Sequence, residues 1–251
     1  MTHPVAPPPG SSERPYGIVG DGSLARHFRH YLSLSGCASA GWSRREGRVT
    51  GATPSQALRD CPVVLLLISD DAIEPFVSAH PELQDRVLVH CAGGLVSPRA
   101  RAMHPLMTFG PDLYDLGTYQ AIPFVCEPGR PGFREVFPGL SNPAYALNPA
   151  DRPLYHSLCV LAGNLTPFLW EKLFTVFLHR FGLPREVAEP YFRQVVQVCQ
   201  GPLPFPHSGP VTRGDRGAVA RHLEALRGDP YRAVYEGFVR AVAPELLEPA
   251  R

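Results

Sequence analysis

The stretch YGIVGDGSLA, residues 16–25, decides the fold that this sequence predicts. A short apolar run leads into Gly20, Gly22 and Ala25, which have the spacing G-x-G-x-x-A. In dinucleotide-binding folds the first glycine permits a tight turn and the second lets backbone approach a pyrophosphate. The third small residue lets the helix pack closely on the strand. An ordinary strand-to-helix turn can carry the same spacing, so the sequence around the motif has to distinguish a phosphate-binding turn from an ordinary one.

The surroundings alternate between strand and helix patterns. Residues 23–36 predict a helix with Leu24, Phe28 and Leu32 on one face and Gly36 at its end. Such alternation predicts an α/β fold with a parallel sheet and right-handed crossovers. The expected strands are residues 16–19, 37–42, 62–69, 86–93 and 120–127.

The second half of the chain has few strand signals. Helices are expected over residues 154–181, 185–200, 215–228 and 231–243, the third with Asp215 as N-cap. The first of these is apolar on most faces, which predicts burial. We therefore expect a flexible segment over 1–15, a Rossmann-like domain over 16–150, and an all-α domain over 151–251.

Composition narrows the class of protein. The 251 residues are 44% hydrophobic and 19% charged, with a net charge of +1, which fits a soluble globular protein. This balance gives no reason to expect a nucleic-acid or membrane partner. Six cysteines without a C-x-x-C pair indicate reduced thiols and a cytoplasmic protein. Unpaired cysteines and the absence of H-x-x-x-H spacing on a helix argue against a metal site.

The cofactor-binding residues are predicted from the ends of the strands. At the first helix entrance they are Gly20, Asp21, Gly22, Ser23, Leu24 and Ala25, where free N–H groups and the helix dipole favour phosphate. An NAD enzyme would place an acid at the end of the second strand, but this chain has Ser43, Arg44 and Arg45. Because arginine can take a 2′-phosphate in bidentate fashion, the sequence favours NADP(H). The alternative is a solvated charge cluster.

Two further strand ends are expected to line the cofactor crevice. Ser69 follows the third strand and Cys91 follows the fourth. Asp71 and Glu74 have the spacing of a capping box, so Asp71 is expected to cap the next helix.

The motifs together resemble a known family. The segments GIVGDGSLA, WSRR, LLLISDDAI, VLVHCAGGL, MHPLMTF, YHSLCVLAGN and SGPVTRGD follow one another as in short bacterial Rossmann-like proteins with a C-terminal helical domain of unknown function. That family is similar in architecture to pyrroline-5-carboxylate reductase, ketopantoate reductase and the 6-phosphogluconate dehydrogenase group. The resemblance implies an oxidoreductase that uses a nicotinamide cofactor on a small C=O or C=N substrate and that often dimerises through the helical domain.

Three residues are candidates for catalysis. His104 lies before Pro105, after the fourth strand, and could face the nicotinamide, or it could be an ordinary loop histidine. His156 and Asn164 lie on the long helix, eight residues apart, so they are separated by about 80° around the axis and about 12 Å along it. They could bracket a small substrate, although a lone histidine on an apolar helix is often a core residue. Pro167 predicts a kink near Asn164.

A last motif, HSGPVTRGD over residues 207–215, leads into a helix. Thr212, Arg213 and the free N–H groups there form a candidate anion site. Pyrroline-5-carboxylate reductase has a comparable turn that holds substrate carboxylate, so the resemblance implies substrate binding. Plain capping by Asp215 is the alternative.

These observations lead to one functional hypothesis with two rivals. The protein is expected to reduce a small carbonyl compound, a 2-keto acid being the first candidate, with NADPH on the first domain and substrate between the domains. His156 or His104 would donate the proton, and Asn164 would orient the substrate. The rivals are a cyclic-imine reductase and a catalytically silent NADP-binding sensor or scaffold.

Overall fold

A seven-stranded sheet forms the centre of the N-terminal part of the protein. The computed structural model describes residues 14–248, so the flexible segment expected over 1–15 lies almost wholly outside the described residues. The strand order is β2-β1-β3-β4-β5-β6-β7, parallel from β2 to β5. The strands are β1 Tyr16–Val19, β2 Ser39–Trp42, β3 Val63–Leu66, β4 Val87–His90, β5 Arg101–Pro105, β6 Phe124–Cys126 and β7 Ala144–Ala146.

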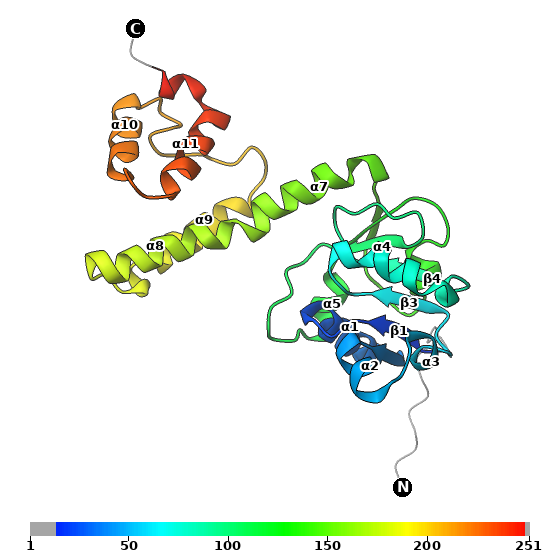
Figure 1. The fold of residues 1–251 in the computed structure, drawn as a ribbon. Helices are drawn as coiled ribbons and strands as arrows, with labels where there is room; N and C mark the ends of the chain where they lie inside the picture. The colour runs from blue at the N-terminus through cyan, green and yellow to red at the C-terminus, as the bar shows by residue number, and fades with distance from the viewer. Residues whose placement is uncertain (1–13, 249–251) are drawn as a thin grey trace. The chain divides into compact units, whose positions relative to one another are not determined.

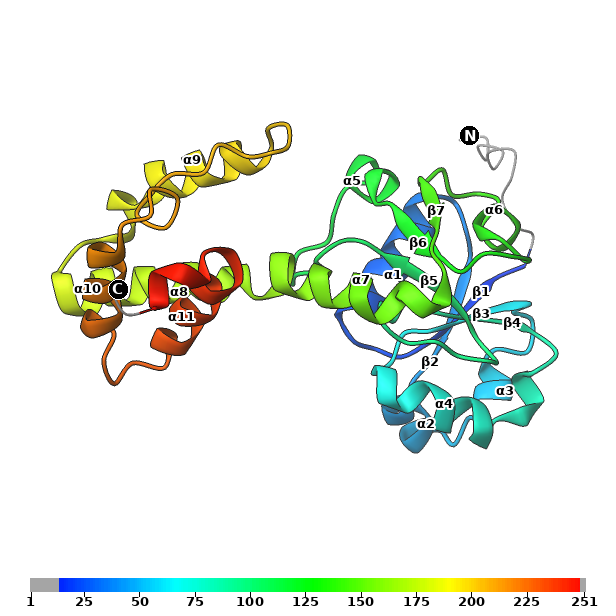
Figure 2. The same ribbon diagram turned by 90° about the horizontal axis from the view of Figure 1, so that it is seen from above.

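Alternate residues of the central strands build two cores, one on each face of the sheet. Ile18, Leu65 and Val89 pack with the first helix in one cluster. Val64 and Leu88 pack with Ile73 and its helix in the other, and Figures 1 and 2 show helices α1 and α4 on opposite faces. Burial on both faces explains why these strands are apolar throughout. The covering helices are α1 Ser23–Leu34, α2 Arg44–Thr50, α3 Pro54–Ala57, α4 Asp70–Ala79, η1 Pro81–Leu83, α5 Leu116–Ala121 and α6 Phe133–Val136.

The far edge of the sheet differs from the sequence prediction. The strand expected over 120–127 is shorter, because α5 runs to Ala121 and β6 begins at Phe124. β6 pairs antiparallel with β5, and β7 adds parallel to β6. Neither β5 nor β7 was predicted, because Arg101 and His104 interrupt the apolar pattern of β5 and all three residues of β7 are exposed.

The long helix expected over 154–181 is interrupted. η2 Pro149–Asp151 leads into α7 Arg152–Cys159, which continues as a π-helical turn, η3 Val160–Asn164, and then as α8 Thr166–Phe181. The Leu165 N–H donates to the Val160 carbonyl at 2.9 Å, five residues back. The irregularity predicted near Asn164 is therefore present, as a π-turn.

The prediction that this helix is buried was wrong. Leu154, Leu158 and Leu161 are 64%, 55% and 58% exposed. Their spacing, i, i+4 and i+7, is that of one helix face, so apolar composition here marks an uncovered stripe rather than a core.

The chain divides into two compact units, the first ending at Trp170 and the second beginning at Glu171. The domain boundary that the sequence predicts after residue 150 lies within η2, upstream of this division, and the predicted domain bounds stay a prediction. In the second unit the helices are η4 Arg185–Val187, α9 Glu189–Cys199, α10 Arg216–Ala225, α11 Tyr231–Val242 and η5 Pro244–Leu247. As predicted, Asp215 caps α10, accepting from the Ala218 N–H at 2.9 Å. None of the helices described is both long and apolar enough to span a bilayer.

Candidate cofactor and active site

The turn between β1 and α1 can accept only glycine at its first position. Gly20 has a φ of +123°, and a Cβ there would lie 2.2 Å from the Leu67 carbonyl oxygen. Gly22 is the N-cap of α1, makes no side-chain cap, and has open space where a Cβ would stand. Ala25 is fully buried, so the helix packs directly on the sheet. The first N–H groups of α1 are thus presented without a capping side chain, as anion binding requires.

The polar side chains of this turn have partners within the protein. Asp21 forms an exposed ion pair with Arg45 at 3.2 Å. The Ser23 hydroxyl contacts the carbonyls of Phe109 and Gly110 at 3.1 and 3.0 Å. Ser23 and the partly buried Leu24 can therefore offer a cofactor their backbone rather than a free hydroxyl.

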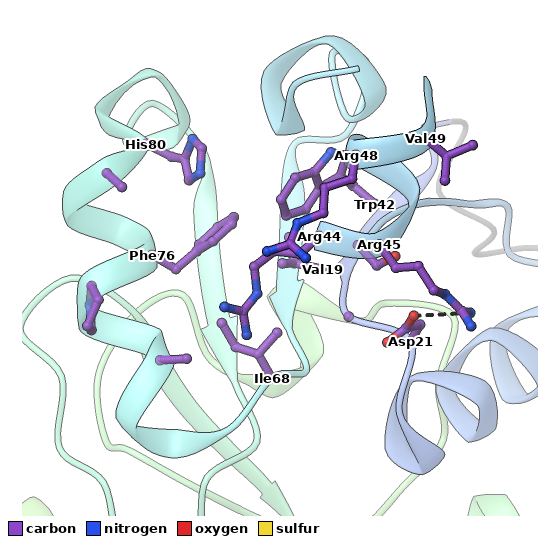
Figure 3. A pocket seen from close by; sticks show the side chains of 15 residues that line it. Val19, Asp21, Trp42, Arg44, Arg45, Arg48, Val49, Ile68, Phe76 and His80 are labelled. Carbon is purple, nitrogen blue, oxygen red and sulfur yellow. Dashed lines mark ion pairs between the residues drawn. The ribbon is translucent and has the colours of Figure 1, made fainter. Parts of the chain in front are cut away.

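A cavity of about 860 Å³ opens beside this turn, within the size range of small-molecule sites. It lies at the carboxyl ends of β1 and β2, bounded by α2 and α4 (Figure 3). Arg44 and Arg48 reach into it from α2, whereas Arg45 is directed to Asp21. The cavity therefore combines cationic side chains with the Gly20–Asp21 turn, which leads directly into the uncapped start of α1.

Aromatic rings form one wall of the same cavity. The ring centroids of Phe76 and His80 are 4.5 Å apart, and that of Trp42 lies 5.9 Å from Phe76. Flat rings beside arginines suit a purine base that carries a phosphate. The sequence analysis did not select Arg48, Phe76 or His80. Arg48 could have been found, because it follows Arg44 by one helical turn.

Ser43 and Ser69 are the N-cap residues of α2 and α4, but only Ser43 caps its helix with its side chain. The Ser43 hydroxyl accepts from the Glu46 N–H at 3.2 Å at the start of α2, so this side chain has a structural partner. Ser69 is the N-cap residue of α4 but makes no side-chain cap. The capping box expected from Asp71 and Glu74 is absent, because the helix starts two residues earlier than that box requires.

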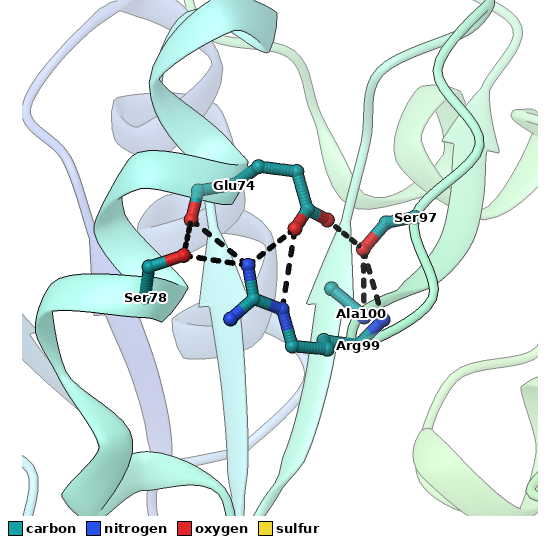
Figure 4. A network of polar contacts seen from close by, with 5 residues as sticks. All are labelled: Glu74, Ser78, Ser97, Arg99 and Ala100. Carbon is teal, nitrogen blue, oxygen red and sulfur yellow. Dashed lines mark hydrogen bonds and ion pairs between the residues drawn. The ribbon is translucent and has the colours of Figure 1, made fainter.

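Glu74 instead joins α4 to the loop before β5 (Figure 4). Its carboxylate accepts from the Ser97 hydroxyl and from the Arg99 guanidinium, the latter at 2.6 Å. These bonds, with the Ser97 contact the largest, lower the pKa of Glu74. The Ser97 oxygen also accepts from the Ala100 N–H at 2.9 Å. The network holds one end of the β4–β5 loop in place.

The two predicted catalytic histidines lie close together in the first unit. His104 is on β5 and His156 is on α7, and their ring centroids are 5.5 Å apart. His104 Nδ1 lies 2.8 Å from the Tyr155 hydroxyl. The sequence analysis missed Tyr155, although it is adjacent to His156. The cluster therefore combines two imidazoles and a phenol from elements about fifty residues apart in the chain.

Burial determines the charge of this cluster. It lowers the pKa of His104 to about 4, with His156 and Arg152 adding smaller contributions. Burial raises the pKa of Tyr155. At neutral pH His104 is consequently uncharged and Tyr155 retains its proton, so the pair is a neutral hydrogen-bonded dyad. Asp70 is also close enough for His156 to lower its pKa, although burial raises it more.

His156 lies against the two glycines that follow β4. A Cβ on Gly93 would fall 2.1 Å from His156 Nδ1, and one on Gly94 would fall 3.4 Å from His156 Cβ. Nδ1 is buried without a hydrogen-bond partner among the described residues. The imidazole therefore packs against bare backbone, and Nε2 is the ring nitrogen left to meet a ligand.

The other predicted site residues are more dispersed. Cys91 follows β4 as expected, and burial raises the pKa of its thiol, which excludes it as a ready nucleophile. Asn164 is exposed in the π-turn, outside the histidine cluster. Thr212 and Arg213 are exposed in the second unit, where the Thr212 hydroxyl contacts the Ser208 carbonyl at 3.3 Å. Roles for these three residues remain predictions.

Comparisons with known proteins confirm the predicted fold. Residues 126–242 match the family model described as "Domain of unknown function (DUF2520)". A search of curated proteins gives no match. Solved structures with the same fold include a provisionally assigned NADP oxidoreductase from Bacteroides fragilis, with 19% identity and a TM-score of 0.71 over 92% of this chain and 98% of that one.

Two further solved structures were determined with a nicotinamide cofactor bound. A reductive aminase from Aspergillus terreus, in complex with NADPH4, cyclohexanone and allyl amine, is 16% identical with a TM-score of 0.64 over 93% of this chain and 95% of that one. Pyrroline carboxylate reductase from Plasmodium falciparum, with NADP bound, is 13% identical with a TM-score of 0.51 over 94% and 98%. The chain thus has the fold expected from its resemblance, a Rossmann-like sheet followed by helices, and residues 126–242 match the DUF2520 family.

Proposed function

We propose that the protein is an NADPH-dependent oxidoreductase that reduces a small carbonyl compound, a 2-keto acid being the first class to test. The observation that carries the proposal is the cavity of about 860 Å³, which is lined by Gly20 and Asp21, just before the uncapped start of α1, and by Arg44 and Arg48. The backbone at Gly20 and Gly22 would bind the pyrophosphate, and the two arginines would bind the 2′-phosphate. The similarity in fold to proteins solved with NADPH or NADP supports this assignment.

NADPH supplies the hydride when it is bound, so the protein must orient the substrate and manage one proton. His156 lies against the two glycines that follow β4 with its Nδ1 buried, and it is our candidate proton donor, acting through Nε2, with His104 as the alternative. Tyr155 holds His104 in position through their 2.8 Å contact. We retain Asn164 as a substrate-orienting residue, and Thr212 and Arg213 as residues that contact the substrate carboxylate.

A cyclic imine is the second candidate substrate, and the charge of the cluster favours it. His104 is neutral at physiological pH, because burial lowers its pKa to about 4. A carbonyl oxygen needs a proton from the protein during reduction, whereas an imine nitrogen can arrive already protonated. A substrate panel of 2-keto acids and cyclic imines, assayed by NADPH oxidation, distinguishes the two. Tight NADPH binding without turnover on any member would favour the sensor instead.

Cofactor selectivity tests the first step. We expect the wild-type protein to bind NADPH more tightly than NADH, and R44A and R48A each to weaken NADPH binding about 10- to 100-fold while leaving NADH unchanged, because a charge-assisted hydrogen bond contributes about 1.5–3 kcal/mol. Arg221→Ala on α10 is the matched control and should change neither affinity. Equal wild-type affinities in a fluorescence titration would remove the 2′-phosphate assignment.

We further propose that the protein is a homodimer. The exposed stripe of Leu154, Leu158 and Leu161 gives α7 and its π-turn an uncovered apolar face. Soluble monomers rarely expose a contiguous apolar surface of this kind, and a second copy of the chain would cover it.

A further inference from the structure

Arg152, the first residue of α7, is a buried cation in an unfavourable position. It is fully buried, yet none of the described carboxylates lies within ion-pair distance of it. Its Nη1 has no hydrogen-bond partner among the described residues. A positive charge at a helix N-terminus also opposes the helix dipole. Burial lowers the pKa of Arg152, and the charge of Glu127, which raises that pKa, opposes burial only in part. A buried cation without an ion pair costs several kcal/mol, so the stability of the fold does not explain this arginine.

The hydrogen bonds that Arg152 makes to other described residues both go to one short loop. Its Nη2 donates to the Ala92 carbonyl at 2.9 Å, and its Nε donates to the Leu95 carbonyl at 3.2 Å. Between these two carbonyls lie Gly93 and Gly94. The fixed fork of the guanidinium therefore spans the two-glycine turn and holds both of its ends.

His156 occupies the middle of the same turn. It follows Arg152 by four residues, so both side chains leave the same face of α7. Its ring rests on Gly93, where a Cβ would lie 2.1 Å from Nδ1. Within one turn of α7, Arg152 therefore binds both ends of the loop and His156 covers its centre.

We propose that Arg152 is a positioning residue, which clamps α7 to the Ala92–Leu95 turn and thereby fixes His156 with Nδ1 covered and Nε2 presented. The far end of the same loop is held independently by Ser97 and Glu74. The Arg152 clamp is therefore what fixes the position of the loop relative to α7. The inference rests on the proposed function where His156 acts on a substrate. The geometry of the clamp can be tested without any substrate.

The first experiment measures the reactivity of His156 with diethyl pyrocarbonate by mass spectrometry. R152M should raise the labelling rate of His156 several-fold, because release of α7 from the loop uncovers Nδ1 in addition to Nε2. R152K should behave like R152M, because an ammonium is a compact donor that cannot span both carbonyls. His27, which is buried and bonded to Tyr119 at 2.8 Å, is the internal control for unfolding and should remain unlabelled. Wild-type labelling of His156 in R152K would overturn the clamp.

Gly93→Ala tests the same contact from the loop side with Arg152 intact. The new Cβ would displace the imidazole, so His156 labelling should rise as it does in R152M. This variant keeps the proposal falsifiable if R152M does not fold. Unchanged labelling in G93A would show that His156 does not depend on this contact.

A double-mutant cycle then separates positioning from a general structural role. With the substrate found in the panel, R152M should lower kcat by about 10²-fold with little change in KM, as expected for a misplaced catalytic group. In an H156A background the same change should have little further effect. An equal loss in both backgrounds would overturn the proposal, whereas absence of turnover in the wild type would count against the proposed function and leave the labelling result in force.

Discussion

At the residue scale, two glycines of one motif have different physical reasons for being glycine. Gly20 needs its positive φ and lies against the Leu67 carbonyl, so its requirement comes from folding. Gly22 has an ordinary backbone conformation and open space around it, so nothing in the fold requires it. The sequence motif does not distinguish the two positions. In the structure, the fold requires glycine at Gly20, whereas glycine at Gly22 is expected to serve the ligand.

We therefore expect G20A and G22A to fail in different ways. G20A should lower the free energy of unfolding by about 1–3 kcal/mol or more, because it combines backbone strain with a clash against main chain. G22A should unfold like the wild type but bind NADPH more weakly, because a methyl group would occupy the space where the pyrophosphate approaches. Urea unfolding and NADPH titration of both variants check this pair. Equal NADPH affinity for G22A and the wild type would contradict the assigned pyrophosphate position.

The histidine pair gives a second prediction at this scale. H156A should lower kcat by about 10²-fold or more if His156 is the proton donor. The pKa of His104, about 4, lies below the assay range, so His104 should contribute no ionisation to the pH–rate profile between pH 5 and 9. Profiles of the wild type and of H104Q should therefore have the same shape. A limb near pH 6 that disappears in H104Q would show that His104 titrates in the working enzyme.

At the element scale, the central strands could be predicted because burial on both faces makes them continuous apolar runs. β5 could not, because its polar residues have partners in distant segments: His104 contacts Tyr155 of the site, and Arg101 donates to the Pro128 carbonyl at 3.0 Å. The glycine turn and Arg44 were visible locally. The Arg152 clamp was not, since it joins residues about sixty positions apart.

Strand β4 carries a titratable group that should make the protein sensitive to acid. His90 is fully buried without a partner for either ring nitrogen among the described residues, and burial, with Arg152 next, lowers its pKa from 6.5 to about 4. The unfolded state binds this proton more readily, so stability is fully present above pH 6.5 and falls toward pH 4, by up to about 3 kcal/mol. In urea unfolding, His90→Leu should show a shallower loss over that range. A slope equal to that of the wild type would exclude His90 as a source of the acid sensitivity.

At the scale of the whole molecule, the prediction of a Rossmann-like sheet followed by helices was confirmed, and the prediction that the long helix is buried was wrong. Apolar composition shows that a helix face avoids water but not what covers it. The covering surface can come from another chain, which one sequence does not display. The substrate is hidden for a related reason, because it depends on side chains brought together from distant segments.

The homodimer proposal makes a prediction at this scale. The wild-type protein should sediment as a dimer in analytical ultracentrifugation, and L158E with L161E should shift it toward the monomer, because two charges would lie on the apolar stripe. Leu203→Glu, at another exposed leucine, is the matched control and should remain dimeric. A monomeric wild-type protein would refute the proposal.

The π-turn after α7 has a consequence for how this chain can change. It accommodates one residue more than an α-helical turn, since Leu165 bonds five residues back. Removing Gly163 would let the backbone close into a regular α-helix with the side chains before and after it close to their present phase, because the π-turn is where the extra residue is absorbed. The chain can therefore lose one residue at this point with the change confined to a single turn, and the contacts of His156 upstream are left as they are.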